Sequence, residues 1–228
     1  MDWSVIVEYK SYFITGFINT IMLTTVGVLV GMVIGLVLGL MNLSGKWWLR
    51  TPAKVYVDIF RGTPLLLQIL FIHFAVIPTI WESMGMIPPS ALFSGFVALS
   101  LNAGAYIAEI FRGGIQSVDK GQMEAARSLG MSHGQAMRYV ILPQAFKRML
   151  PPLGNEFIAL LKDSSLVAII AVYDITYAAF TTAKNTWERW APYLVAAAMY
   201  YILTFVLSRV VFWMEGRLRT DAERSEQP

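Results

Sequence analysis

Long apolar stretches, separated by polar and charged segments, dominate the pattern of this chain. Residues 11–45, 62–81, 83–108 and 190–208 contain no Asp, Glu, Lys or Arg. A helix needs about 20 apolar residues to cross a bilayer, so these stretches are long enough to be membrane spans. A further stretch, over about 154–173, is apolar except at its centre. The pattern predicts spans at about 15–43, 62–81, 89–110, 154–173 and 190–212, a polar loop over 112–152 and a C-terminal tail over 213–228.

The predicted fourth span is unusual because Lys162, Asp163 and Ser164 lie in its middle. Asp163 is eight residues beyond Asn155, or roughly 12 Å at 1.5 Å per residue. A charge at this depth costs about 2.5–3.5 kcal/mol, which indicates a polar pathway, an ion pair or a broken helix. Glu156 precedes Asp163 by seven residues, so an unbroken helix would place both on one side. Two interpretations stay open: a pathway group, or a structural Lys162–Asp163 pair inside the bundle.

The third predicted span carries a polar face. Asn102, Tyr106 and Glu109 are spaced i, i+4 and i+7, so they share one side of a helix. Polar groups at membrane depth usually face the protein interior or a water-filled cavity. Asn102 is the deepest of the three, whereas Glu109 has the alternative role of an i,i+3 ion pair with Arg112.

Small residues recur along the first predicted span. The strip repeats every fourth residue and consists of Gly27, Gly31, Gly35 and Gly39. Such strips let helix backbones approach closely in lipid. We therefore expect this face to pack tightly against another helix and to have no role in transport.

The polar loop contains two helix-start signals in succession. Capping-box spacing is found twice, in the pairs Asp119 and Gln122, and Ser132 and Gln135. Gly130 lies where a helix would end in a left-handed residue, and Pro143 limits the second helix. The sequence predicts a short helix over about 120–129, a tight turn, and a second helix to about 142. Ala125 and Ala126 give the first helix a small-residue face for docking.

Composition and charge agree with a membrane protein. Of the 228 residues 56% are hydrophobic and 14% charged, with a mean hydropathy of +0.56, whereas soluble domains carry about a quarter charged residues. There is no cysteine, and the histidines are His73 and His133. We therefore expect no disulfide framework and no metal site. No nucleic-acid partner is expected either.

The basic residues predict the orientation. Fourteen of the 18 lie on one side of a five-span chain, among them Arg50, Arg127 and Arg148. The opposite side carries Lys10 and, in an expected outer loop over 181–189, Lys184 and Arg189; Lys162 is in the fourth span. Because cytoplasmic loops are enriched in Lys and Arg, the N-terminus is predicted outside, and the polar loop and the C-terminus in the cytoplasm. The expected fold is an all-α integral membrane protein, one domain over 1–228, with five transmembrane helices.

The polar loop resembles the cytoplasmic loop of ABC-importer permeases. The family motif has Glu-Ala-Ala, a Gly six residues after the Glu, and an Ile-x-Leu-Pro ending; this chain has Glu124, Ala125, Ala126, Gly130, Leu142 and Pro143 at that spacing, with Val140 where Ile is usual. Arg61-Gly-Thr-Pro followed by Gln68 resembles the polar amino-acid branch of the same permeases, as does the run from Asn102 to Gln122.

The resemblance implies a permease that works with a second permease subunit, two ATPase subunits and an extracytoplasmic solute-binding protein in the bacterial cytoplasmic membrane. The residues implied for ATPase coupling are Glu124, Ala125, Ala126, Gly130 and Pro143. Those expected along the amino-acid pathway are Asn102, Tyr106, Glu156, Asp163 and Ser164, with Thr63, Gln68, Glu109 and Lys162 as secondary candidates. The chain has no Gly-x-x-x-x-Gly-Lys-Ser/Thr motif, so no cofactor is expected here and the partner ATPase would use Mg-ATP.

Two other functional classes stay open. A secondary transporter would use Asp163 or Glu109 as an ion or proton carrier, and a membrane scaffold would dock partners without transporting anything. The acidic groups favour a cationic amino acid such as arginine, lysine or histidine, but glutamine and glutamate stay open. The residues leave a homodimer and a heterodimer equally open.

Overall fold

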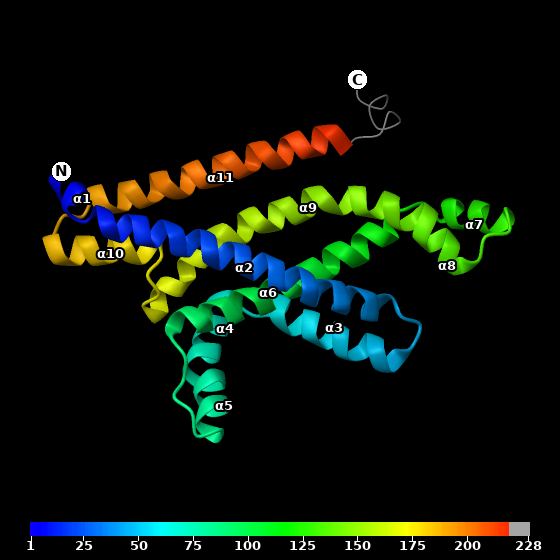
Figure 1. The fold of residues 1–228 in the computed structure, drawn as a ribbon, viewed down its shortest axis with the longest axis horizontal. Coiled ribbons are helices and arrows are strands. Elements are labelled where there is room, and N and C mark those ends of the chain that lie inside the picture. Colours follow the sequence, from blue (N-terminus) through cyan, green and yellow to red (C-terminus); the bar gives the residue numbers. More distant parts are fainter. Residues whose placement is uncertain (219–228) are drawn as a thin grey trace.

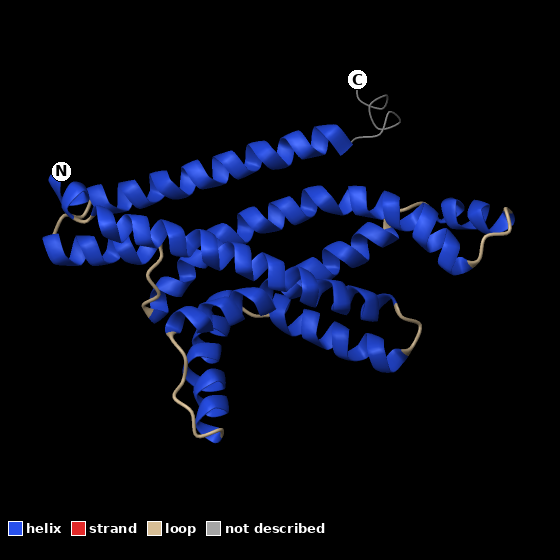
Figure 2. Ribbon diagram, in the orientation of Figure 1, coloured by secondary structure: helices blue, strands red, loops and turns tan. Residues whose placement is uncertain are grey.

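Helix α2 (Lys10–Leu43) is the longest helix, and its glycine face is the surface against which α6 packs (Figure 1). The structure is a computed structural model that describes residues 1–218, and these residues contain no strand (Figure 2). Leu23 of α2, Leu99 and Ile107 of α6 and Leu160 of α9 belong to one buried apolar cluster. The core of the molecule therefore lies where α2, α6 and α9 meet.

The other elements follow in chain order. They are α1 (Ser4–Glu8), α3 (Trp47–Gly62), α4 (Leu65–Phe71), the π-helical segment η1 (Ile72–Val76), α5 (Ile77–Ser83), α6 (Ala91–Gln116), α7 (Lys120–Ser128), α8 (His133–Ala136), the π-helical segment η2 (Met137–Ile141), α9 (Leu142–Asp163), the 3₁₀ helix η3 (Ser164–Ile170), α10 (Ile175–Thr186) and α11 (Ala191–Leu218). The predicted tail 213–228 begins inside α11, and residues 219–228 lie outside the described part of the chain.

The glycine strip of α2 packs directly on α6, which confirms the packing interpretation. A Cβ on Gly31 would lie 2.8 Å from the Cβ of Ala103, and one on Gly35 would lie 2.6 Å from Cγ2 of Ile107. Non-bonded carbon atoms do not approach each other this closely. The two helix backbones can therefore pack at this distance only because residues 31 and 35 are glycines.

Four helical segments within residues 1–218 are long and apolar enough to cross a membrane: Lys10–Leu43, Leu65–Ser83, Ala91–Gln116 and Ala191–Arg217. The predicted fourth span, 154–173, is not among them. It is also not a single α-helix, because α9 ends at Asp163, η3 follows, and Ala171 adopts a left-handed conformation with φ of 58°. The helix thus changes its winding next to the charged pair in the sequence, one of the alternatives that the charges indicated.

Two expectations about loops are wrong. Pro143 does not end the second helix of the polar loop: the chain stays helical through η2 into α9, where Pro143 is in the first turn. Pro143 has no N–H to donate to the preceding turn, and the π-helical turn η2, where the hydrogen-bond pattern changes, lies directly before it. The expected outer loop over 181–189 is also helical up to Thr186, because Asp174 starts α10.

Asp174 is fully buried and anchors α10. Its carboxylate accepts hydrogen bonds from the backbone N–H groups of Thr176 (3.1 Å) and Tyr177 (2.8 Å), and from the hydroxyl of Tyr200 in α11 (2.9 Å). This cap joins α10 to α11 at one end of the long axis, beside the N-terminus (Figure 1). The hairpin of α7 and α8 lies at the opposite end of that axis.

Candidate functional site

The polar face of α6 meets the corner between α3 and α4. The Nδ2 of Asn102 donates a 2.9 Å hydrogen bond to the Oε1 of Gln68, and the Nε2 of Gln68 donates to the carbonyl of Phe60 (2.8 Å) and to the Oγ1 of Thr63 (2.9 Å). Asn102 is 5% exposed and Gln68 8%. The structure thus brings together three residues that the sequence singled out on two separate segments, and their amides bond to each other inside the protein.

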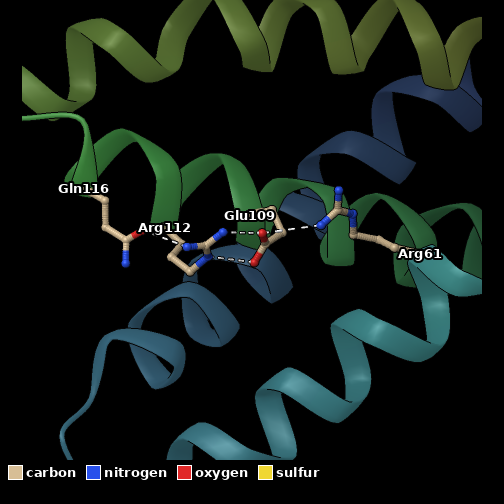
Figure 3. A network of polar contacts seen from close by, with 4 residues as sticks. All are labelled: Arg61, Glu109, Arg112 and Gln116. Carbon is tan, nitrogen blue, oxygen red and sulfur yellow. Dashed lines mark hydrogen bonds and ion pairs between the residues drawn. The ribbon is translucent and has the colours of Figure 1, made fainter.

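Glu109 lies about two turns beyond Asn102 along this face and contacts two arginines (Figure 3). Arg112 donates from Nε (2.9 Å) and Nη2 (2.7 Å) to the two carboxylate oxygens, which confirms the i,i+3 pair. The Nη1 of Arg61, in the last turn of α3, is 3.4 Å from the Oε2 of the same carboxylate. The guanidinium of Arg61 also lies over the ring of Tyr106, 5.3 Å from its centre. Sequence reasoning missed Arg61 as a partner of this face.

The end of α9 places its polar residues in different environments. Ser164 is fully buried, and its hydroxyl donates a 2.7 Å hydrogen bond to the carbonyl of Leu161. Lys162 and Asp163 are exposed, and the ion pairs formed by residues 1–217 do not include one between them. Glu156 is half-buried, and the charges of Asp163 and Arg61 both act on its carboxyl. The carboxyl groups of Glu156 and Asp163 therefore both lie on α9, while the hydroxyl of Ser164 is occupied.

The turn between α7 and α8 has the geometry that its sequence predicts. Gly130 has a φ of +85°, its N–H donates to the carbonyl of Arg127, and the N–H of Met131 donates to the carbonyl of Ala126. These two bonds form a Schellman motif, which satisfies the last carbonyls of α7. Leu129, at the tip, is 85% exposed.

The two expected capping boxes have different outcomes. The box of Ser132 and Gln135 is present with both of its bonds. Asp119 caps α7 through the N–H of Gly121 (2.6 Å), but Gln122 does not return a bond to it. The Oε1 of Gln122 instead accepts a 3.2 Å hydrogen bond from Gln144 in α9. Only one reciprocal box therefore forms, and Gln122 instead connects the hairpin to α9.

The residues of the docking motif differ in accessibility. Glu124 and Ala125 are exposed on α7, as is Pro143, whereas Ala126 is only 4% exposed. The expected small-residue face is thus open at Ala125 and covered at Ala126. Glu124 is the fifth of the nine residues of α7, so its exposed carboxylate lies in the middle of the helix, beyond the first turn where it would serve the helix dipole.

The hairpin is firmly attached to the two helices that carry the polar residues. Val118, Ile141, Ala145 and Met149 form a buried apolar cluster between the end of α6, η2 and α9. The Nη1 of Arg148 in α9 also donates to the carbonyl of Ser117, which follows α6. The base of the hairpin is therefore in contact with both α6 and α9.

Comparison with known proteins identifies the family. The profile of the family described as "Binding-protein-dependent transport system inner membrane component" matches residues 27–220. The glutamine transport system permease protein GlnP of Escherichia coli (strain K12) is 37% identical over 218 residues, which cover 96% of this chain and 98% of GlnP. The arginine transport system permease protein ArtQ of Bacillus subtilis (strain 168) is 36% identical over 169 residues, 74% of this chain and 75% of ArtQ.

Solved structures show the same fold. A chain of an amino acid ABC transporter crystallised with histidines is 42% identical and matches with a TM-score of 0.88, covering 95% of this chain and 99% of that one. A chain of the MetNI methionine ABC transporter, at 19% identity, shares the fold with a TM-score of 0.76. The chain therefore belongs to the binding-protein-dependent transport system inner membrane components, and it is a permease subunit of an ABC importer.

Proposed function

We propose that this permease carries a polar L-α-amino acid across the bacterial cytoplasmic membrane. The observation that carries the proposal is the layout of α9. One end of this helix is attached to the exposed hairpin, and the other end carries Asp163, where the α-helical winding stops. A displacement of the hairpin would move α9 and with it the polar end of this helix. This arrangement suits a transporter whose pathway is opened and closed from outside the membrane.

The substrate chemistry follows from the acidic groups. An amino acid that leaves water needs an acceptor for its ammonium group, and a buried charge is costly unless it is paired. Asp163 is exposed without an ion-pair partner and Glu156 is half-buried, so both can receive a cation. The glutamine and arginine permeases among the relatives support a polar amino acid. The acidic pair favours a cationic side chain, and glutamine is the main competitor.

The proposed mechanism is alternating access driven by separate ATPase subunits. The partners are a second permease subunit, ATPases that use Mg-ATP and contact the α7–α8 hairpin, and an extracytoplasmic solute-binding protein. A conformational change of this kind requires that the partners bind the two states with different affinities. The hairpin can serve this purpose because Glu124 and Leu129 are exposed while its base is packed on α6 and α9.

Uptake by the reconstituted complex tests the proposal. Proteoliposomes that contain the permease, its ATPase and its solute-binding protein are expected to accumulate one of L-arginine, L-histidine, L-glutamine or L-glutamate only when Mg-ATP is supplied on the cytoplasmic side. A proton or sodium gradient without ATP is expected to have no effect. Gradient-driven uptake by the permease alone would favour the secondary transporter instead.

We further propose five spans, with the hairpin in the cytoplasm and α10 outside. The chain has no cysteine, so single Cys variants report accessibility without background. Cys at Lys184, exposed near the end of α10, is expected to react with an impermeant thiol reagent in intact cells. Cys at Leu129, on the hairpin, is expected to react only after the membrane is opened. Labelling with the opposite sidedness would contradict the proposed orientation.

A further inference from the structure

An amino acid also needs a donor for its α-carboxylate, and the neutral donors Ser164, Asn102 and Gln68 are occupied. The hydroxyl of Ser164 is buried and bonded to the carbonyl of Leu161. The amide nitrogen of Asn102 donates to Gln68, and that of Gln68 donates to the carbonyl of Phe60. A carboxylate that enters a low-dielectric site without donors pays the full desolvation cost. A cationic side chain must therefore neutralise the carboxylate.

Arg61 has donors to offer. Glu109 is held by Arg112 through two short hydrogen bonds of 2.9 and 2.7 Å, whereas Arg61 approaches the same carboxylate only to 3.4 Å. The side chain of Arg61 is 43% exposed. Within residues 1–217 the guanidinium of Arg61 forms this ion pair with Glu109 and lies over the ring of Tyr106. A guanidinium carries five N–H donors in a planar fork that fits a carboxylate. Arg61 is therefore the loosely held cation of the cluster in Figure 3.

The position of Arg61 also fits a zwitterion. It lies at the end of α3, two residues before Thr63, whose hydroxyl is bonded to Gln68. The charges of Arg61 and of Asp163 both act on Glu156. The guanidinium of Arg61 and the carboxyl groups of Glu156 and Asp163 on α9 carry the opposite charges that the carboxylate and the ammonium group of an amino acid require.

We propose that Arg61 binds the α-carboxylate of the transported amino acid. The proposal rests on the proposed function of amino-acid transport and adds the group that recognises the acid end of the substrate. Arg61 rests against Glu109 and the ring of Tyr106 in this structure, and on binding it forms a bidentate pair with the carboxylate. Glu109 keeps its pair with Arg112 when Arg61 turns away, so no buried charge is left alone.

Recognition of the carboxylate is tested by removing it from the probe. The permease–ATPase complex in nanodiscs, without the solute-binding protein, is titrated with radiolabelled L-arginine and, separately, L-glutamine. Unlabelled free acid and its α-carboxamide then compete with each probe. The wild-type complex is expected to prefer at least one free acid by about tenfold or more, the loss that accompanies a missing charge-assisted hydrogen bond. Arg61→Gln is expected to bring this ratio close to one, and Arg61→Lys to retain part of it.

Two matched variants separate binding from structure. Glu109→Gln removes the ion pair of Arg61 but not the guanidinium, so it is expected to keep the preference for the free acid. Lys162, an exposed secondary candidate of the pathway, is the alternative cation for the carboxylate. If Arg61 binds the carboxylate, Lys162→Met is expected to keep the preference as well. Copurification of the ATPase with every variant reports assembly.

The proposal is overturned if Arg61→Gln keeps the wild-type ratio, if Glu109→Gln or Lys162→Met loses it equally, or if wild type shows no preference for either acid. Uptake distinguishes this failure from that of the proposed function. ATP-driven uptake by wild type together with an unchanged ratio in Arg61→Gln rejects only the role of Arg61. Absence of ATP-driven uptake of all four amino acids by wild type rejects the function itself.

Discussion

Replacing Asp163 with Asn is expected to reduce amino-acid uptake about 10- to 150-fold while the complex still assembles and keeps its basal ATPase activity. The change preserves shape and removes the charge. Hydrogen bonds to a charged group contribute about 1.5–3 kcal/mol, and each 1.4 kcal/mol is tenfold in affinity. Asp163 is exposed and has no ion pair with Lys162, so the substitution leaves no buried cation without its partner. Uptake into proteoliposomes and copurification of the ATPase measure the two effects.

The competing interpretation of Asp163, a structural pair with Lys162, predicts the reverse. It predicts misassembly of Asp163→Asn and rescue of uptake when Lys162→Met is added, because the second change removes the unpaired charge. Recovered uptake in this double variant would reject the substrate contact at Asp163. Asn102→Ala serves as a comparison: it is expected to weaken uptake less, because it removes a neutral hydrogen bond of about 0.5–1.5 kcal/mol.

Replacing Gly130 with Val is expected to reduce transport and substrate-stimulated ATP hydrolysis to the basal level without preventing membrane insertion. Gly130 has a φ of +85°, and a Cβ there would meet no atom within 4 Å. The cost is therefore one of backbone conformation and not of a clash: about 1–2 kcal/mol for an L-residue in the left-handed region. The strain falls on the Schellman turn that sets the angle between α7 and α8. ATPase assays with and without substrate measure the loss.

A nearby glycine supplies the control for the hairpin. Gly134 lies in α8, has equally open surroundings and no positive φ, so Gly134→Val is expected to keep ATPase stimulation. Glu124→Lys reverses the exposed charge of α7 and is expected to uncouple the ATPase without changing the fold of the hairpin. Normal stimulation in both Gly130→Val and Glu124→Lys would show that the hairpin is not the coupling element.

The sequence by itself determined the features that depend on neighbouring residues. The left-handed position of Gly130 and the box of Ser132 and Gln135 follow from hydrogen bonds within a few residues, and both are present. The shared face of Asn102 and Glu109 follows from the helical repeat, and the pair of Glu109 with Arg112 from i,i+3 spacing. The close packing of the glycine strip required only that some helix lie against it. The docking motif identified the family through residues of one loop.

Only the tertiary structure decided which distant segments meet. That Asn102 bonds to Gln68, and that Arg61 shares Glu109 with Arg112, depends on how the α3–α4 corner packs on α6. The absence of a reciprocal box at Asp119 has the same origin, because Gln122 accepts a hydrogen bond from Gln144 of α9. The tertiary structure also decided the form of residues 154–173. The sequence left a broken helix as one of three alternatives, and the burial of Ser164, Val167 and Ile170 stabilises a 3₁₀ helix there. Contacts between segments far apart in the chain leave no local pattern, since each residue type there is compatible with several partners.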